Sequence, residues 1–275
     1  MAVHFAHWEC FYDHVDDFRF NHLPRLVKKM RKSEEYHFPE LYRFSTGMEV
    51  DSVIPMMEDQ GDLRHLAFVH HHPATRKRYM TFLFPFAAGG VVQEIRISQV
   101  LDNGNGADGL IVGSAMDKAE VSFFDPFFYK NRRHYQSGHR YRFSLAAVAY
   151  TLTTPDMNSV ELDKDEDNRP LWERLEEAGE RTFNVPLMGM SAYFQIPELG
   201  HGEYTYRVPA RSVREIEFAG RKVYQMRAPL IQLDRDFEVM FYVSERVLTE
   251  GQRPKKHQDY QGCMWLQGYL VDHQP

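Results

Sequence analysis

The sequence predicts a mostly β (α+β) protein: two small OB-like β-barrel or sandwich lobes with an N-terminal helical segment. Apolar residues alternate with polar ones over many short stretches, which is the period of a strand with one buried face. Turns rich in Gly, Asn and Asp separate these stretches, as in small barrels and sandwiches. The 275 residues are 43% hydrophobic and 14% aromatic, enough for a sizeable core and too apolar for a disordered chain.

The first thirty residues predict helices. Apolar residues recur every three or four positions from Phe5 to Phe18, and the stretch from Asn21 to Lys32 keeps that spacing. Basic residues surround the apolar side of the second stretch: Arg25, Lys28, Lys29, Arg31 and Lys32. We interpret this stretch as a solvated amphipathic helix.

The rest of the chain predicts strands and hairpins. The expected strands cover 66–70, 79–84, 91–100, 110–116, 119–123, 141–149, 204–208, 224–230, 237–243 and 264–270. A turn at Pro73 to Arg76 joins the first two, and a loop from Asp102 to Gly109 joins the next two. That loop contains the spacing of a dinucleotide-binding glycine motif. The segment after it alternates like a strand, so we interpret it as a hairpin loop.

The charge distribution suggests the domain organisation. The net charge is −6, but Asp156 to Glu180 holds ten acidic and three basic residues, so this segment carries −7 and the remainder +1. We predict an N-terminal helical segment with a barrel lobe over 1–155, an acidic connector with a short helix over 156–180, and a second β lobe over 181–275.

Several classes of protein are excluded at this level. Cys10 and Cys263 are the only cysteines, too few for a disulfide framework. No apolar run reaches the length of a membrane span, and the N-terminus has no secretory signal pattern. We therefore expect a cytoplasmic protein that does not contact a membrane.

The aromatic and basic stretch from Phe123 to Phe143 is the candidate binding surface. The predicted binding residues are Phe127, Phe128, Tyr129, Lys130, Arg132, Arg133, Tyr135, Arg140 and Arg142, extended by Arg76, Lys77 and Arg78. Such residues could stack bases and track phosphates. They could also form a protein contact, since Arg and Tyr favour interface hot spots. In a third interpretation the aromatic residues plug the end of the barrel and the arginines are solvated.

Catalytic chemistry finds little support in the sequence, and we expect no cofactor. Ser191 lacks the second glycine of a nucleophile elbow. Asp125 could be a desolvated general acid, although an Asp-Pro pair more often begins a turn. His70 and His72 would share one face of a strand, which makes them weak candidates for a transition-metal site.

One resemblance extends over part of the chain. The carrying residues are Gly113-x-Ala115, Phe123-Phe124-Asp125, Tyr135-x-x-Gly138-x-x-Tyr141-x-Phe143-x-Leu145, Ala149-Tyr150 and the tail Gly262-x-x-Trp265-Leu-Gln-Gly-Tyr-Leu270. Over 110–150 and 203–270 the chain resembles an uncharacterised bacterial protein family with OB-like β-barrels. The resemblance implies this fold and brings no activity and no catalytic residues.

These observations favour a non-enzymatic binding protein that acts through protein–protein contacts within a bacterial complex. The first alternative is single-stranded nucleic-acid binding by an OB-like barrel through residues 127–142. The second is a metal-dependent enzyme that uses His70 and His72.

Overall fold

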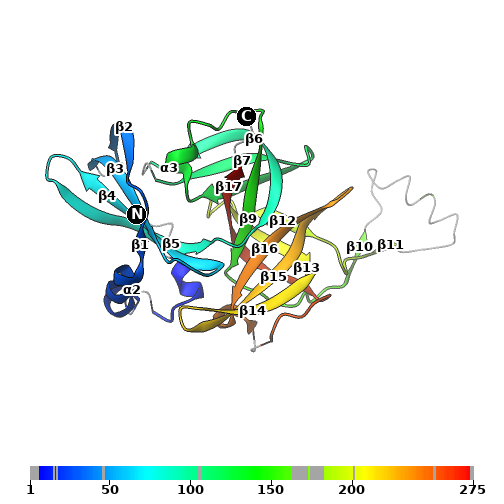
Figure 1. The fold of residues 1–275 in the computed structure, drawn as a ribbon. Helices are drawn as coiled ribbons and strands as arrows, with labels where there is room; N and C mark the ends of the chain where they lie inside the picture. The colour runs from blue at the N-terminus through cyan, green and yellow to red at the C-terminus, as the bar shows by residue number, and fades with distance from the viewer. Residues whose placement is uncertain are drawn as a thin grey trace.

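The computed structural model describes residues 6–272, except 15, 17, 45–46, 105–106, 163–172, 174–182, 201 and 250–251. The described strands form sheets of five, two and ten strands, so the mostly β prediction is confirmed. Figure 1 shows the five-stranded sheet at the left of the molecule, against the larger ten-stranded sheet. Within the described ranges, no helix combines the length and the apolar character needed to cross a membrane.

Helical structure near the N-terminus is shorter than predicted. It consists of a 3₁₀ turn at Ala6–Cys10, a π turn at Phe18–His22 and the helix α2 at Leu23–Lys29. The expected helix from Phe5 to Phe18 is wrong over residues 11–14, because the apolar residues there pack on separate elements. The Trp8 indole donates to Leu83 O (3.0 Å), whereas Phe11 packs edge-on against Phe218.

The five-stranded sheet follows these turns. Its strands are β1 (Arg31–Lys32), β2 (Tyr36–Arg43), β3 (Glu49–Met57), β4 (Leu63–His72) and β5 (Lys77–Ala87). The order is β1-β3-β4-β5, and β2 also pairs with β3. The predicted hairpin around Pro73 is confirmed by the antiparallel pair β4–β5.

Five strands of the ten-stranded sheet close a barrel. They are β6 (Val91–Asp102), β7 (Gly109–Ala115), β8 (Ala119–Asp125), β9 (Arg140–Ala149) and β17 (Asp259–Asp272). Antiparallel pairs join β6 to β7 and β9, β7 to β8, and β9 to β17. A parallel contact between Phe124 of β8 and Gln267 of β17 completes the ring. Numbered along the chain, the strand order is 1-2-3-5-4-1, and a short helix, α3 (Phe128–Asn131), lies between the third and fourth strands. This arrangement is OB-like.

The same sheet continues into a second curved half. The strands are β12 (Ala192–Gln195), β13 (Glu203–Pro209), β14 (Ser212–Phe218), β15 (Arg221–Gln232) and β16 (Asp236–Ser244), which a 3₁₀ turn at Glu245–Val247 follows. β16 pairs with β9, and β13 pairs with β17. The Ser191 hydroxyl, just before β12, donates to Pro229 O of β15 (2.6 Å), so the sheet curves until β12 lies near β15. A separate pair, β10 (Ser159–Leu162) and β11 (Phe183–Pro186), protrudes at the right of Figure 1.

The two halves share β9 and β17. The first half of β17 pairs with β13, and its second half pairs with β9. Residues 181–275 therefore supply the fifth strand of the barrel that 91–149 begins, and this strand pairing does not match the prediction of a separate second lobe over 181–275. Most of the predicted acidic connector over 156–180, including the residues from 163 to 180 other than Glu173, lies outside the described residues.

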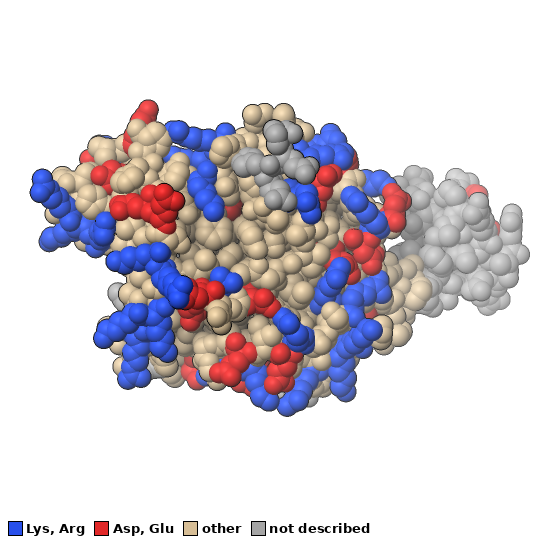
Figure 2. All heavy atoms as spheres, viewed as in Figure 1, with Lys and Arg blue, Asp and Glu red and all other residues tan. Residues whose placement is uncertain are grey.

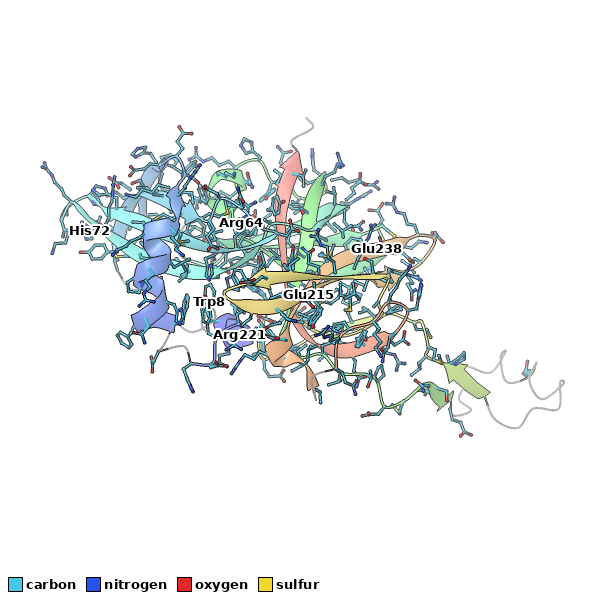
Figure 3. The ribbon with its side chains drawn as sticks, turned by 60° about the horizontal axis from the view of Figure 1, so that its bottom comes forward. Trp8, Arg64, His72, Glu215, Arg221 and Glu238 are labelled. Carbon is cyan, nitrogen blue, oxygen red and sulfur yellow. The ribbon has the colours of Figure 1, made fainter. Side chains whose placement is uncertain are left out.

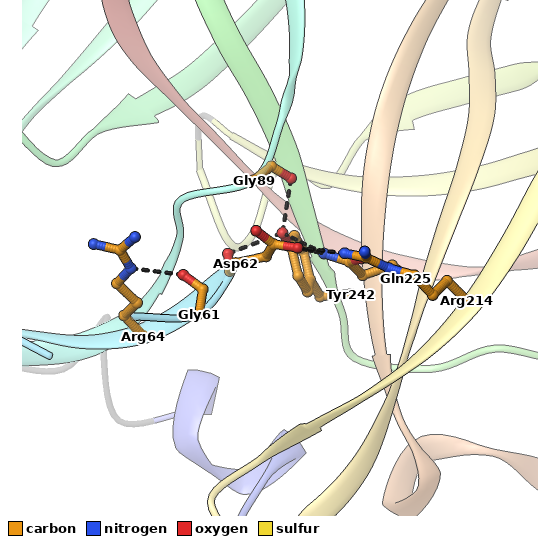
Figure 4. Close-up of polar contacts among 7 residues, drawn as sticks. All are labelled: Gly61, Asp62, Arg64, Gly89, Arg214, Gln225 and Tyr242. Carbon is orange, nitrogen blue, oxygen red and sulfur yellow. Dashed lines mark hydrogen bonds and ion pairs between the residues drawn. The ribbon is translucent and has the colours of Figure 1, made fainter. Parts of the chain in front are cut away.

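A polar network ties the five-stranded sheet to the second half of the large sheet (Figure 4). The Tyr242 hydroxyl lies 2.9 Å from Asp62 O and 2.7 Å from Gly89 O. The Gln225 amide donates to the Asp62 carboxylate (2.9 Å), which also pairs with Arg214. Because Asp62 precedes β4 and Gly89 precedes β6, this network fixes the connections around the five-stranded sheet.

Candidate functional site

The aromatic residues of the predicted binding surface lie mostly in the core. Phe128, Tyr129 and Tyr135 are buried, and Phe127 is half-buried. Tyr129 packs edge-on against Phe68 of β4, with ring centroids 5.8 Å apart. α3 and its flanks therefore plug one end of the barrel. This corrects the prediction that Phe128, Tyr129 and Tyr135 form a binding surface, and it matches the plug interpretation.

The basic residues of the same segment are exposed or half-buried, and several are neutralised. Arg132 pairs with Asp102 (3.2 Å), and Arg140 pairs with both Glu94 (3.0 Å) and Asp117. The Lys130 ammonium lies 4.7 Å from the Phe127 ring centroid. Arg133 and Arg142 are exposed. Carboxylates thus already contact part of the charge that phosphates would need.

Two other parts of the predicted surface lie elsewhere. The β4–β5 turn of the five-stranded sheet carries Arg76, Lys77 and Arg78, whereas α3 belongs to the barrel. Arg78 pairs with Glu35 (3.1 Å). Arg140 instead lines a polar pocket of about 300 Å³ at the barrel surface. The pocket residues are Glu94, Arg96, Ser114, Met116, Asp117, Arg140, Asp234 and Arg235. Its acidic and basic groups are equal in number, so it has no preference for an anion.

The face that OB-like barrels use for single strands is covered by the chain itself. That face belongs to the second and third strands, here β7 and β8. Phe123 points into the barrel against Phe143, so alternation directs Ser122 and Phe124 outward. Both are nevertheless buried. Tyr204 of β13 accepts from Ser122 N (2.7 Å), and Phe124 packs against Phe84 of β5.

The histidine pair is not arranged as a metal site. His70 is buried, contacts the Thr81 hydroxyl (2.6 Å) and packs edge-on against Phe44. Burial lowers the pKa of His70 to about 4. His72 lies near the far end of the hairpin (Figure 3), where its Nδ1 accepts from Thr75 N (3.4 Å). No group of three metal-ligating side chains occurs in the part of the chain that the structure describes.

Two carboxylic acids, Asp125 and Glu203, are buried at separate positions, and sequence reasoning singled out only Asp125. Asp125 accepts from Phe127 N (2.9 Å) and from the Tyr135 hydroxyl, as an Asp-Pro turn would. Burial raises the pKa of Asp125 to about 7. Burial also raises the pKa of Glu203 to about 7, and Glu203 accepts from the Tyr150 hydroxyl (2.7 Å). Both groups are buried, and their hydrogen bonds join neighbouring segments of the core, so we interpret them as packing residues.

The second half of the large sheet carries an exposed apolar surface that sequence reasoning missed. Met188 and Phe194 are each 70% exposed, and Met157 and Met190 are also exposed. We call these four residues the methionine face. They are absent from the predicted binding residues because three of them lie in loops, where no periodicity marks them.

Backbone contacts bring the methionine face together. Arg207 of β13 donates to Met157 O (2.8 Å) and lies 3.6 Å from Asp259. The loop before β12 donates to the same carboxylate through Gly189 N (2.8 Å). Phe194 pairs with Thr205, two residues from Arg207, so its side chain shares the face of Arg207.

The two edges of the large sheet differ in charge. β14 at one edge carries Arg214, Glu215 and Glu217, and charged edge residues oppose the addition of another strand. β12 at the other edge reads Ala-Tyr-Phe-Gln and carries no charge. Among the described strands only β13 pairs with β12. The methionine face therefore borders an edge that lacks this protection.

Comparison of the chain with protein-family models, with curated proteins and with solved structures finds no match. The fold and the exposed surface define a β-barrel protein without a recognisable catalytic constellation among the described residues. The resemblance to the bacterial family stays a prediction.

Proposed function

We propose that the chain is a non-enzymatic binding protein that holds a protein partner on the methionine face. The supporting observation is the exposure of three methionines and a phenylalanine on segments that contact or pair with β13 and the start of β17. Contiguous exposed apolar side chains on a soluble domain mark interaction sites. Methionine adapts its shape to different apolar surfaces, which suits it to such contacts.

The chemistry of this surface defines the segment it would bind. Fully burying one Met or Phe side chain contributes about 1.5–3 kcal/mol, so four such side chains can support a stable contact. An extended segment with apolar, uncharged side chains fits this surface best. It could pair with β12 through its backbone while its side chains contact Met188 and Phe194.

The two alternative functions have less structural support. Nucleic-acid binding through residues 127–142 would need bases to stack on aromatic residues, of which Phe128, Tyr129 and Tyr135 are buried. A metal-dependent enzyme would need His70, whose ring already contacts Thr81 inside the core. Protein binding requires no rearrangement of the fold.

Site-specific photo-cross-linking tests the proposal. A photoreactive phenylalanine analogue is placed at Phe194 in the full chain, expressed in the cells from which the chain comes. The matched control carries the analogue at Leu41, which is 57% exposed on β2 of the five-stranded sheet. We expect one heterologous cross-linked product at 194 that is missing at 41 and is lost when Met188→Glu is added. Equal products at both positions would refute the proposal, and a cross-linked homodimer would replace the partner with a second copy of the chain.

A further inference from the structure

A basic stripe runs along one side of α2 and into β1. Arg25, Lys28 and Lys29 follow the three- and four-residue spacing of one helix face, and Lys32 comes shortly after. All four side chains are exposed. Leu26 and Met30, by contrast, are buried against the rest of the protein. Figure 2 shows basic side chains gathered at the lower left, over the position of α2 in Figure 1.

The charge of this stripe is not compensated locally. Many arginines of the chain contact a carboxylate: Arg31 with Asp59, Arg43 with Glu49, Arg78 with Glu35, Arg132 with Asp102, Arg211 with Asp236 and Arg246 with Asp13. Within the described ranges, none of the four stripe residues forms such an ion pair. Burial opposes the lowered pKa of Glu58, which His65 produces together with a smaller contribution from the charge of Lys29, so Glu58 interacts with one stripe residue without forming an ion pair with it. Outside the acidic segment at 156–180 the chain carries only +1, so four neighbouring positive charges are a local excess.

An exposed aromatic ring lies at the start of the stripe. Phe20, on the π turn that leads into α2, exposes 69% of its surface. The turn and α2 are consecutive in the chain, and Phe20 comes five residues before Arg25, so the exposed ring lies within about two helical turns of the stripe. A positively charged track beside an exposed aromatic ring is the combination that single-stranded nucleic acids recognise, through phosphate contacts and base stacking.

We propose that the surface formed by Phe20, Arg25, Lys28, Lys29 and Lys32 binds single-stranded nucleic acid. Lysines form most of the stripe, and lysine is depleted from protein–protein interfaces. α2 is only seven residues long, which leaves it little apolar face to insert into a membrane. This site is separate from the methionine face, and it differs from the 127–142 segment, where carboxylates contact Arg132 and Arg140.

Fluorescence anisotropy with labelled oligothymidine and oligouridine tests the proposal. An oligonucleotide of about 20 nucleotides exceeds the roughly 4–16 nucleotides that small single-strand sites cover. Four phosphate contacts give a slope of about −2.8 in log K against log salt, so affinity should fall about 50-fold between about 50 and 200 mM salt. Phe20→Ala should weaken binding at both salt concentrations without changing this slope, because stacking releases no counterions.

Charge-matched variants, each lacking three exposed basic side chains, locate the site. Arg25→Ala/Lys28→Ala/Lys29→Ala should lose at least 10-fold in affinity at low salt, whereas Lys130→Ala/Arg133→Ala/Arg142→Ala should bind like the wild type. Circular dichroism establishes that each variant is folded. Equal losses in both variants, or no binding at about 50 mM salt, where phosphate contacts are strong, would overturn the proposal. So would equal binding to polyglutamate, or binding to anionic phosphatidylserine vesicles but not to the oligonucleotides.

Discussion

Tyr135 donates a hydrogen bond of 2.5 Å to Asp125 inside the end of the barrel. Both residues are buried, and the Asp125 carboxylate also accepts from Phe127 N (2.9 Å). The contact joins the end of β8 to the segment that leads into β9. A stretch that looks like a binding loop in the sequence is therefore held inward by one carboxyl group.

The pH dependence of stability should report on this carboxyl group. Burial raises its pKa from 3.8 to about 7, so the folded state binds the proton more tightly than the unfolded state. The stabilisation is complete below about pH 4 and is lost as pH rises through 7, for a total of about 4 kcal/mol at most. Glu203 should also lower the free energy of unfolding as pH rises over a similar range, because burial raises its pKa from 4.5 to about 7.

Asp125→Asn should therefore flatten the dependence of the free energy of unfolding on pH, measured in urea at several values from pH 4 to 8. Glu198→Gln removes an exposed carboxylate and should leave that dependence as it is in the wild type. An unchanged slope in Asp125→Asn would mean that folding does not shift the pKa of Asp125.

Phe128→Ala tests whether the aromatic segment is a plug. The ring is buried against the backbone at Gly109, where an added Cβ would lie 2.7 Å from it. We expect a loss of about 3–5 kcal/mol, as for other large buried aromatic residues. Arg133→Ala, at an exposed neighbour, should change stability by less than about 0.5 kcal/mol. Similar small effects of both substitutions in urea unfolding would contradict the plug.

Gly262→Ala should be strongly destabilising. A Cβ at this position of β17 would lie 2.1 Å from Thr151 O, a backbone atom that cannot move without disturbing the neighbouring chain. We expect a loss above about 3 kcal/mol, in the range of severe overpacking. Gly47→Ala is the control: its φ of +83° is strained for alanine, but the space around it is open, so about 1–2 kcal/mol is expected. Thermal unfolding of the two variants gives the comparison.

Tyr242→Phe should weaken the connection between the five-stranded sheet and the large sheet. The hydroxyl contacts Asp62 O and Gly89 O, and its loss leaves these carbonyl groups with fewer partners. A loss of about 1–3 kcal/mol is expected for such buried groups. Tyr79→Phe, on the exposed hairpin, should have almost no effect. Hydrogen exchange should increase near Asp62 and Gly89. Unchanged protection there would contradict the role of Tyr242 in holding the two sheets together.

Period-two alternation predicted the hairpins at 66–84 and 91–116 because each depends on neighbours in sequence. It could not predict that β17 returns to β8 and β9, since pairing between distant strands leaves no local pattern. The spacing of Trp8 and Phe11 resembled a helix face, although the two rings pack on different elements.

The candidate site was harder to predict than the fold. Composition identifies a cluster of aromatic and basic residues, but it does not reveal that Phe128 and Tyr135 point inward. Met188 and Phe194 are exposed because β12 is the edge strand of the large sheet, and the order of strands in a sheet cannot be read from local sequence. The sequence predicted the α2 stripe as a helical pattern. Only the structure shows that, unlike Arg43, Arg132 and Arg211, its described residues form no ion pair with a carboxylate.

The sharing of β17 has a consequence for synthesis of the chain. Four barrel strands leave the ribosome well before residues 259–272, and until then β8 and β9 expose backbone edges on both sides of an open seam. Strands that are far apart in the sequence pair more slowly than the two strands of a hairpin, so the seam stays open longer than a hairpin would. During that interval the final strand of one molecule could enter the seam of another. The last strand thus gives this chain a route to domain-swapped dimers.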